Sequence, residues 1–530
     1  MSFEKRYSSS IEGFEKYRHI GGFILGPIIF FLILFAGTPE GFIQNAKTLL
    51  PSGMTQDQVL QLAYGTKVSL ALLLLMVIWW VTEAVPIPVT ALLPGIVLPL
   101  FHITGVYQEK LFQFTGKNIL SNYANPIIFL FLAGFLLAAA LQKWKLDRRL
   151  TLYILTRGGL ANSTSSVLLG MMCISAFLSM WISNTATTAM LLPLGVGVIA
   201  QSGSKVGETN FGKSLMLGIA WGASIGGVGT IIGTPPNGIC VSILSASGIR
   251  QFSFIEWMKF GIPFVILFIP IAWFILLKVF PLEIKNIQGG KKLLVEQQSK
   301  LGNWSKGEKL TIIGFAVVVF LWVSNPFWNY ILPTQLSDNL KWFDENIIAL
   351  FGVLILFLLP VDWKKQKFVL SWSDAKFVDW GTLLLFGGGI ALSDGMFKTG
   401  LANWLAKTAV SFLGSPSTIV MMFVLIILLE LLTEVTSNTA VTSMMIPIII
   451  SIASGTGNDP VALSVAATLA ASMAFMLPVA TPPNALVYGT GYIKITDMVK
   501  GGIVLDIIAW FFTAAIVYFV ADKLLGVISF

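Results

Sequence analysis

Two short clusters of polar side chains interrupt the hydrophobic sequence. They contain many of the side chains through which this chain could bind a ligand or act chemically. The first reads SNTATTAMLLP from Ser183 to Pro193, and the second reads SNTAVTSMMIP from Ser437 to Pro447. Hydroxyl and amide groups donate hydrogen bonds to anions, and their oxygens are ligands for hard cations. Polar groups are costly in apolar surroundings, so their duplication favours a binding site over a simple kink.

A second motif is also duplicated. GTPPNGI (Gly233 to Ile239) matches ATPPNAL (Ala480 to Leu486). Two adjacent prolines remove two N–H donors and interrupt a helix, which leaves carbonyls free at the end of the first half-helix. We expect Asn237 and Asn484 to cap the second half-helix.

The two motifs predict the elements that hold them. Ser, Asn and Thr favour caps and turns, and apolar arms of about 15–20 residues suit hairpins that enter a membrane and turn back. We therefore predict re-entrant hairpins at 163–201 and 414–454, with a new helix beginning near Ala186 and Ala440. Broken helices are predicted at 212–246 and 460–492.

Together these elements predict one site at the middle of a membrane. Helix N-termini and hydroxyls would face a carboxylate, and carbonyl and amide oxygens would face a monovalent cation. Neither motif contains or adjoins a Lys or Arg. Anion binding would therefore depend on helix N-termini, small polar groups and co-bound cations.

Composition places the chain in a membrane. Of its 530 residues, 55% are hydrophobic and 11% charged, with a mean hydropathy of +0.81, whereas soluble domains carry about 25% charged residues. We predict an all-α polytopic protein with about eleven transmembrane helices and the two hairpins. The spans are expected at 20–38, 66–84, 86–101, 125–140, 212–246, 257–282, 308–326, 345–361, 380–396, 460–492 and 501–526.

The net charge of +8 indicates orientation and not a nucleic-acid partner. With a cytoplasmic N-terminus, most Lys and Arg residues fall on the cytoplasmic side, among them Lys143, Arg148, Lys205 and Lys292, as the positive-inside rule requires. We expect a multi-pass protein of the cell membrane, with its C-terminus extracellular.

The order of the motifs predicts two related halves. The expected divisions are an N-terminal segment and first span (1–65), a first repeat (66–282), a cytoplasmic linker (283–309) and a second repeat (310–530). With the first span set aside, the predicted number of crossings on each side of the linker is odd, so the second repeat is inverted relative to the first. Inverted repeats with a site at their midplane interface are a common plan of secondary transporters.

Other candidate residues are weaker. Glu83, Asp394, Glu430 and Glu434 are carboxylates near or within the membrane; Glu83 is expected at an interface, and Glu434 either supports the second hairpin or contacts a cation. GASIGGVG (Gly222 to Gly229) favours close helix packing over a nucleotide loop.

The histidines and cysteines suggest neither an enzyme nor a metal centre. Cys173 and Cys240 lie in apolar segments without metal-ligand spacing, and His19 and His102 are peripheral. An intramembrane enzyme would need a nucleophile with a base, or a metal cluster. We therefore expect no enzymatic activity and no cofactor.

The paired motifs, together with WWVTEAVPIPVTALLP (Trp79 to Pro94), resemble the divalent anion:sodium symporter family. This family includes bacterial Indy-type dicarboxylate carriers and animal sodium–dicarboxylate and sodium–citrate transporters. The resemblance covers roughly residues 20–526. It implies a homodimer with a scaffold domain and a transport domain that moves like an elevator.

The resemblance also implies roles for particular residues. One sodium site would use Ser179, Ser183, Asn184 and the Gly233 backbone. The second would use Thr433, Thr436, Asn438 and the Ala480 backbone. Substrate carboxylates would meet or be enclosed by Ser183, Asn184, Thr185, Thr234, Pro235, Ser437, Asn438, Thr439, Thr481 and Pro482.

The expected function is sodium-coupled import of C4-type dicarboxylates such as succinate, malate or fumarate. Two alternatives remain open within transport: sodium-independent dicarboxylate exchange, for example with 2-oxoglutarate, and transport of citrate or another divalent anion. A passive channel is a further alternative, which saturable uptake would exclude.

Overall fold

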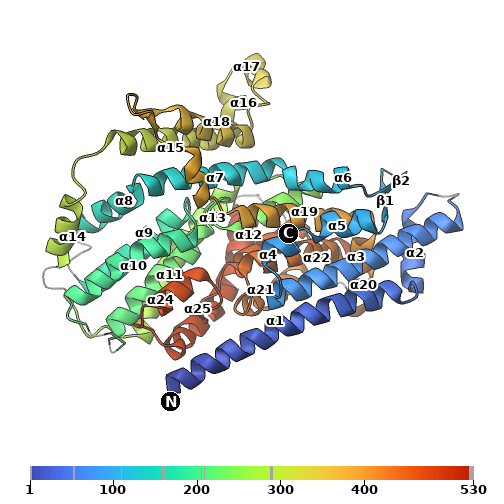
Figure 1. The fold of residues 1–530 in the computed structure, drawn as a ribbon, viewed down its shortest axis with the longest axis horizontal. Coiled ribbons are helices and arrows are strands. Elements are labelled where there is room, and N and C mark those ends of the chain that lie inside the picture. Colours follow the sequence, from blue (N-terminus) through green and yellow to red (C-terminus); the bar gives the residue numbers. More distant parts are fainter. Residues whose placement is uncertain are drawn as a thin grey trace.

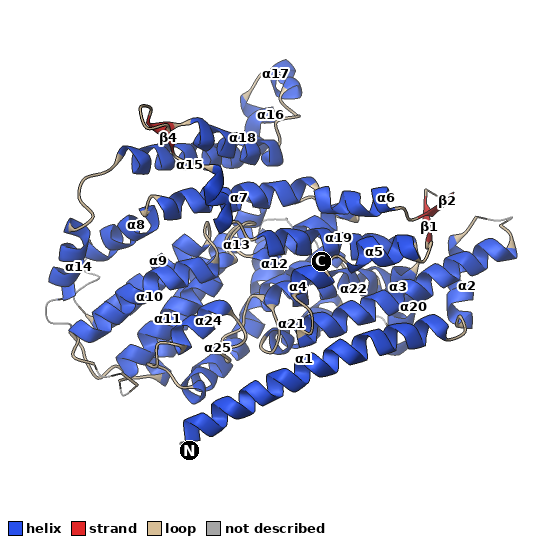
Figure 2. Ribbon diagram, viewed as in Figure 1, coloured by secondary structure: helices blue, strands red, loops and turns tan. Residues whose placement is uncertain are grey.

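The computed structural model describes residues 3–51, 54–108, 110–157, 163–204, 206–207, 209–286, 290–414 and 416–524. Nearly all of its regular structure is helical, and two short β-hairpins lie at the periphery (Figure 2). Seven of the described helical stretches are long and apolar enough to cross a membrane. The chain is thus a polytopic helical membrane protein, as its composition predicts.

The N-terminal part consists of two long antiparallel helices and several short elements. Helix α1 (Phe3–Phe35) packs along α3 (Gln56–Thr82), and α2 (Glu40–Leu49) lies at their far end (Figure 1). The span predicted at 86–101 is instead two short helices, because four prolines interrupt it. The short elements are α4 (Ile87–Thr90), α5 (Leu93–Leu100), β1 (Thr104–Tyr107), β2 (Lys110–Gln113), α6 (Gly116–Leu120) and the 3-10 helix η1 (Ser121–Ala124).

Each half contains the same succession of elements: a long helix, a shorter helix, a helical hairpin, a broken helix and a final long helix. The first half comprises α7 (Pro126–Lys143), α8 (Leu146–Thr156), α9 (Thr164–Ser179), α10 (Asn184–Gln201), α11 (Asn210–Gly227), α12 (Pro235–Ala246) and α13 (Phe254–Val279). The second comprises α19 (Trp380–Lys398), α20 (Leu401–Leu413), α21 (Thr418–Thr433), α22 (Asn438–Thr456), α23 (Pro460–Ala471), α24 (Pro482–Tyr488) and α25 (Ile495–Ala515), which continues as η4 (Ile516–Leu524).

The segment between the halves begins with the polar stretch predicted as a linker and continues with two apolar helices, α15 and α18. The predicted linker contains helix α14, although residues 287–289 lie outside the described part. The elements of this segment are α14 (Gly290–Ser299), α15 (Lys306–Ser324), η2 (Asn325–Phe327), α16 (Trp328–Ile331), α17 (Thr334–Asn339), α18 (Glu345–Leu358), β3 (Pro360–Asp362), β4 (Lys367–Phe368) and η3 (Trp372–Phe377).

The two hairpins enter the molecule from opposite ends of its long axis. Helices α9 and α10 of the first hairpin lie toward the end that carries α14, whereas α22 of the second hairpin packs against α20 and α3 and lies toward the end that carries α2 (Figure 1). Hydrogen bonds hold both ends. The Thr164 amide at the start of α9 donates to the Lys285 carbonyl over 3.1 Å, and Lys407 on α20 donates to Thr48 on α2 over 2.9 Å. This is the arrangement that an inverted repeat predicts.

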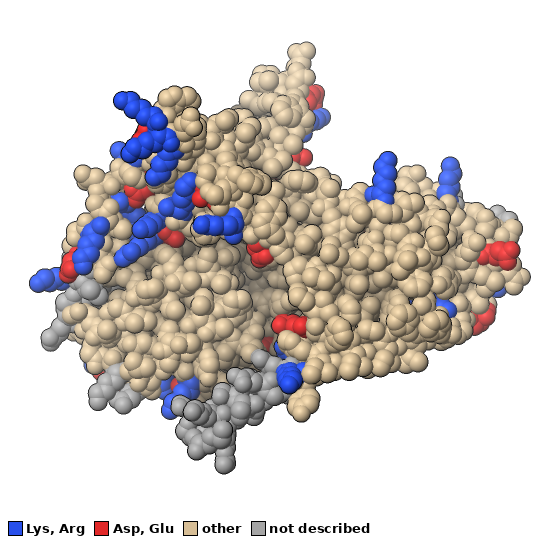
Figure 3. Space-filling model, viewed as in Figure 1, with Lys and Arg blue, Asp and Glu red and all other residues tan. Residues whose placement is uncertain are grey.

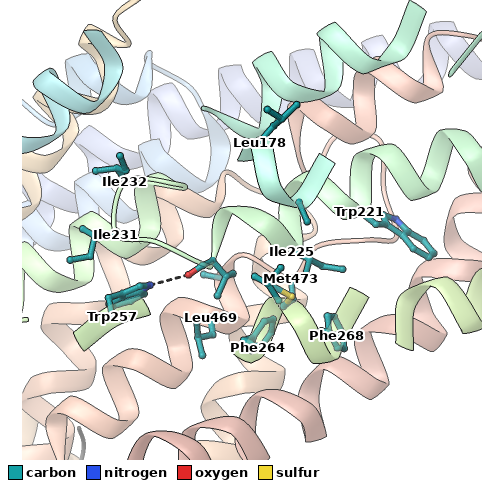
Figure 4. Packing of buried hydrophobic residues seen from close by; sticks show 14 of the residues in the cluster. Leu178, Trp221, Ile225, Ile231, Ile232, Trp257, Phe264, Phe268, Leu469 and Met473 are labelled. Carbon is teal, nitrogen blue, oxygen red and sulfur yellow. Dashed lines mark hydrogen bonds between the residues drawn. The ribbon is translucent and has the colours of Figure 1, made fainter. Parts of the chain in front are cut away.

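The broken helices of the two halves share one hydrophobic core. Residues of α11, α13 and α23 interdigitate there, including Ile225, Phe264 and Leu469 (Figure 4). The Trp221 ring contacts Phe475 with centroids 5.6 Å apart. The breaks in the two helices are therefore held in place relative to each other by close packing.

Basic side chains gather at one end of the molecule. In Figure 3 they cluster over α8, α14 and the β3–β4 hairpin, while the central face is largely uncharged. Some are fixed by ion pairs, such as Arg149 with Glu308 at 2.5 Å and Lys143 with Asp374 at 2.8 Å. Lys205 lies outside the described residues, as do residues 525–530 at the end of the second predicted repeat. The positive-inside rule infers the orientation of a membrane protein from such an unequal distribution of basic residues. The orientation of the termini itself stays a prediction.

Candidate functional site

The first Ser-Asn-Thr cluster forms the tip of a helical hairpin. Helix α9 ends at Ser179 and α10 begins at Asn184, two residues earlier than expected. The Ser183 side chain caps α10 by accepting a hydrogen bond from the Ala186 amide at 3.3 Å. The Ser179 hydroxyl donates to Asn184 Oδ1 over 2.6 Å. The two arms are therefore linked side chain to side chain across a four-residue turn.

The second cluster has the same geometry with different residues. The Thr433 hydroxyl lies 2.6 Å from Asn438 Oδ1 and 2.8 Å from the Ala471 carbonyl, and with one hydrogen it donates to one of them at a time. The Thr436 hydroxyl donates to the Trp80 carbonyl over 3.3 Å. Ser437 stands at the N-cap of α22 without a capping side-chain hydrogen bond. The second tip is thus hydrogen-bonded to α23 and α3, whereas no hydrogen bond described for the first tip reaches these two helices.

The geometry that the two halves share extends to the broken helices, and there it corrects one expectation. Asn237 does not cap the second half-helix. Its Nδ2 donates to the carbonyls of Gly227 at 3.0 Å and Thr230 at 2.7 Å, at the end of the first half-helix α11 and in the following turn. Its amide can reach back because it lies in the first turn of α12, beside the carbonyls that the break exposes.

Asn484 corrects the same expectation in the second half. Its Nδ2 donates to the Ala474 carbonyl at 3.1 Å and the Leu477 carbonyl at 3.0 Å. The N-cap of α24 is Thr481, whose hydroxyl accepts from the Asn484 amide at 3.2 Å. Each asparagine therefore satisfies carbonyls that a broken helix would otherwise leave without donors.

The turn after α11 is held from outside as well. The Trp257 indole donates to the Val228 carbonyl over 2.9 Å, the bond drawn as a dashed line in Figure 4. The neighbouring Ile231 and Ile232 are buried. The irregular backbone here is enclosed by protein, which is the condition for a broken helix within a membrane.

The tips and breaks of both halves meet at one cavity of about 710 Å³. All ten residues predicted to contact substrate line it. They are Ser183, Asn184, Thr185, Thr234, Pro235, Ser437, Asn438, Thr439, Thr481 and Pro482. Residues some 250 positions apart in the sequence are therefore brought to the same space, and their roles in binding stay predictions.

The residues predicted for sodium divide into two groups. Ser183, Asn184, Asn438 and Ala480 line the cavity. Ser179, Gly233, Thr433 and Thr436 do not line it, and all four are buried. A Cβ added at Gly233 would lie 3.1 Å from the Ser179 carbonyl oxygen, so the Gly233 backbone and Ser179 are close neighbours. Each predicted set therefore combines cavity-lining oxygens with buried ones.

The cavity carries negative and neutral side chains. Glu83 and Asp379 both line it, and among the described lining residues there is no Lys, Arg or His. Glu83 adopts a left-handed backbone conformation (φ 51°) at the end of α3, and Arg18 of α1 approaches it at 3.9 Å. An anion in this space meets two carboxylates and no fixed cation of the cavity wall.

Three polar lining residues were not predicted: Gln142, Asp379 and Thr382. Asp379 is the N-cap of α19, where it accepts from the Thr382 amide at 3.0 Å. The sequence DWGT before an apolar run is a helix-start signal, so this cap could have been found. Its place in the cavity could not, because the packing of α19 against the hairpin tips sets it.

Two of the weaker candidates, Asp394 and the glycine-rich segment 222–229, have structural roles. Asp394 pairs with Lys398 within α19 at 2.6 Å. The glycines of 222–229 serve close packing, since a Cβ at Gly226 would lie 2.2 Å from the Ala176 carbonyl oxygen. The described residues contain no group of His, Cys, Asp and Glu placed to bind a metal ion.

Comparison with known proteins agrees with this arrangement. The family profile described as the sodium:sulfate symporter transmembrane region matches residues 58–525. The sodium-dependent dicarboxylate transporter SdcS of Staphylococcus saprophyticus is 35% identical over 96% of this chain and 92% of its own length. SdcS of Staphylococcus aureus (strain USA300) is 36% identical over the same shares.

A solved structure supports the fold. The Alcanivorax borkumensis YdaH transporter, described as having an unusual topology, aligns with a TM-score of 0.53. The alignment covers 86% of this chain and 99% of that one at 14% identity. The profile match and the 35% identity over nearly the whole chain show that this protein is a membrane transporter, not an enzyme, and belongs to the divalent anion:sodium symporter family, whose profile is the sodium:sulfate symporter transmembrane region.

Proposed function

We propose that the protein imports C4-type dicarboxylates such as succinate, malate and fumarate together with sodium ions. The observation that carries this proposal is the cavity itself, which collects both Ser-Asn-Thr tips and both Thr-Pro-Pro segments and has no basic side chain among its described lining residues. Its hydroxyls, amides and helix N-termini suit carboxylates, and its oxygens suit a hard cation.

The charge of the cavity supports coupling to cations. Glu83 and Asp379 line it alongside the anion-binding groups, so a bound dianion needs positive charge from another source. Moving one charge across 100 mV corresponds to about 2.3 kcal/mol, so importing a dianion against a negative interior costs roughly 4.6 kcal/mol. Three or more sodium ions per dianion reverse the sign.

We assign the coupling ions to the two sets of oxygens behind the hairpin tips. The first set is Ser179, Ser183, Asn184 and the Gly233 backbone, and the second is Thr433, Thr436, Asn438 and the Ala480 backbone. The hydrogen bonds from Ser179 and Thr433 to the asparagine Oδ1 atoms hold each set together. The substrate occupies the cavity between the sets.

We further propose an elevator movement in a homodimer. In the predicted arrangement the hairpins are re-entrant and move with the broken helices as a transport domain, against a scaffold that includes α15 and α18. Both scaffold helices expose large apolar side chains, such as Phe320 and Leu354, which suits contact with lipid or a second copy. In this proposal the N-terminus is cytoplasmic, the C-terminus is extracellular and the protein lies in the cell membrane.

Uptake by purified protein in proteoliposomes tests the proposal. Labelled succinate, malate, fumarate and citrate are offered separately, with an inward sodium gradient or with choline in its place. Accumulation that needs sodium and saturates supports symport. Accumulation that persists in choline and needs an internal dicarboxylate contradicts it and supports exchange.

A further inference from the structure

A surface of exposed lysines and tryptophans lies where the apolar helix α18 ends. The helix leads directly into the β3–β4 hairpin, whose turn at 363–366 reads WKKQ. Lys364, Lys365 and the following Lys367 are exposed, and Trp363 is 72% exposed. Figure 3 shows basic side chains clustered over this part of the molecule, at the upper left of the view. The turn thus presents positive charge and an aromatic ring together.

The same surface continues onto the 3-10 helix η3, which follows the hairpin. Trp372 at its start is 71% exposed, and Lys376 near its end is exposed as well. Two basic and aromatic elements are therefore joined into one patch. We call this patch the hairpin surface; it consists of Trp363, Lys364, Lys365, Lys367, Trp372 and Lys376.

The acids of this segment are engaged elsewhere and do not neutralise the hairpin surface. Asp362 accepts from two backbone amides of the turn, at 3.0 and 3.2 Å. Asp374 is buried and pairs with Lys143 at 2.8 Å, and Asp379 caps α19. Within the described chain, no carboxylate forms an ion pair with any lysine of the hairpin surface. Four positive charges are thus left for a partner from outside the chain.

The hairpin is fixed to the ends of two long helices. The Val369 amide donates to the Leu359 carbonyl just after α18, over 3.0 Å. The Trp144 indole, directly after α7, donates to the Val369 carbonyl over 2.9 Å. Lys367 Nζ lies 5.0 Å from the centroid of the Trp144 ring. The exposed side chains therefore keep a set position relative to the helices that carry them.

The helices beside the hairpin place it at a membrane boundary. Strand β3 packs on α15 and β4 on α18, and α15 belongs to a stretch, Lys306–Ile331, that is long and apolar enough to cross a membrane. Both helices expose apolar side chains: Ile313 is 58% exposed, Leu354 54% and Leu358 63%. An apolar helix surface that gives way to tryptophan and lysine is typical of the boundary between acyl chains and headgroups.

The charge of the hairpin surface selects its partner. A second copy of this chain would bring further positive charge to it, whereas an anionic lipid brings the opposite charge. Each lysine beside an anionic lipid surface contributes about fivefold to binding. We propose that the hairpin surface binds the headgroups of anionic phospholipids, with its lysines against the phosphates and with Trp363 and Trp372 at the level of the headgroups.

A lipid bound here stabilises segments that border the cavity. Gln142 at the end of α7 and Phe377 at the end of η3 both line the cavity. The residues next to Gln142 and in η3, Lys143 and Asp374, form the ion pair that joins these two elements. The lipid therefore supports one wall of the cavity from outside. This role does not rest on which anion or cation the protein transports.

Thermal unfolding of the full-length protein in detergent, with lipid added to the micelles, tests the proposal without a transport assay. A ligand that binds only the folded state raises the unfolding midpoint. Phosphatidylglycerol is compared with phosphatidylcholine of the same acyl chains and with soluble glycerol phosphate. The variants are K364Q/K365Q and the charge-retaining K364R/K365R. K110Q/K117Q is the matched control, because Lys110 and Lys117 are exposed on β2 and α6, away from the hairpin.

Phosphatidylglycerol is expected to raise the midpoint of wild type more than phosphatidylcholine does, and 0.5 M NaCl should weaken this difference. K364Q/K365Q should need about 25-fold more phosphatidylglycerol for the same rise, at about fivefold for each lysine. K364R/K365R and K110Q/K117Q should respond as wild type does.

Four results overturn the proposal. They are equal rises with both lipids, an equal rise with glycerol phosphate alone, the same phosphatidylglycerol response in wild type and K364Q/K365Q, and an equal loss of response in K110Q/K117Q. The lipid, soluble-anion and salt comparisons need only wild-type protein. They therefore decide the question even where a variant does not fold.

Discussion

The Ser179 hydroxyl lies 2.6 Å from Asn184 Oδ1 and donates to it, which closes the turn of the first hairpin. Thr433 and Asn438 repeat this contact at 2.6 Å in the second hairpin. In both halves the asparagine is the first residue of a helix whose N-terminus faces the cavity. Its Oδ1 is thus held by a buried hydroxyl, and its Nδ2 is the donor that we propose binds the substrate.

Replacing either asparagine is expected to abolish transport. Asn184→Ala and Asn438→Ala each remove an amide donor from the cavity. Asn184→Ala also leaves the Ser179 hydroxyl without its acceptor, whereas the Thr433 hydroxyl keeps the Ala471 carbonyl. We expect uptake in proteoliposomes to fall at least about 100-fold, as for loss of about 3 kcal/mol of binding. Asn339→Ala, at the exposed end of α17, is the control. Normal uptake by both cavity variants contradicts the site assignment.

Adding a methyl group at Gly227 is expected to disturb the site from behind. A Cβ there would lie 2.5 Å from Asn184 Oδ1 and 3.1 Å from Thr234 Cβ. Gly227→Ala therefore has to displace two predicted substrate contacts, and overpacking of this kind costs about 1–3 kcal/mol. We expect uptake to fall by about tenfold or more. Gly197→Ala, where a Cβ meets open space, should transport as wild type does.

Asn237 and Asn484 are expected to stabilise the breaks and not to bind ligand. Asn237→Ala leaves the Gly227 and Thr230 carbonyls without their donor in a fully buried site. An unsatisfied buried group costs about 1–3 kcal/mol, so the midpoint of thermal unfolding in detergent should fall. Asn237→Asp has the same shape but no amide donor and should fall at least as far. An unchanged midpoint in both variants contradicts this role.

The buried carboxyl of Asp147, on helix α8, leads us to predict that the stability of the fold depends on pH. Burial raises the pKa of its carboxyl from 3.8 to about 6. The folded state therefore holds a proton that the unfolded state has lost between about pH 4 and pH 6, and stability falls as the pH rises through this window. At neutral pH the buried charge destabilises the fold by about 3 kcal/mol at most.

Asp147→Asn is accordingly expected to raise the free energy of unfolding at pH 7.5. The gain should shrink to roughly half at pH 5, because the wild-type carboxyl is then largely protonated only in the folded state. Thermal unfolding in detergent across this range measures it. Asp338→Asn, at an exposed acid paired with Lys341, is the control, and a gain that grows toward low pH contradicts the assignment.

Sequence patterns were sufficient to predict the repeated elements. Short polar residues and paired prolines interrupt helices through local chemistry, so the hairpins and breaks lie within a few residues of their predicted positions. The ten predicted lining residues share one cavity because both copies of each motif occupy equivalent places in related halves. The duplication of both motifs is the reason that this tertiary arrangement could be predicted from a single sequence.

Features that depend on contacts across the fold were missed. The donors of Asn237 and Asn484 point back to the first half-helix because the chain reverses within the break, which composition does not reveal. Asp379 enters the cavity through the packing of α19. Helix α2 was absent from the predicted elements because its amphipathic pattern extends over only ten residues.

The hydroxyls behind the asparagines are expected to govern sodium more than substrate. Ser179 and Thr433 are fully buried and do not line the cavity, so neither can touch a dicarboxylate held there. Ser179→Ala and Thr433→Ala should each raise the sodium concentration for half-maximal uptake by about tenfold, the loss of about 1.4 kcal/mol for one ligand. At saturating sodium the succinate KM should stay within about twofold of wild type. Ser451→Ala, whose hydroxyl bonds within its own helix α22 to the Pro447 carbonyl, is the control. A change in succinate KM at saturating sodium, with no change in sodium dependence, would place these hydroxyls in the substrate site instead.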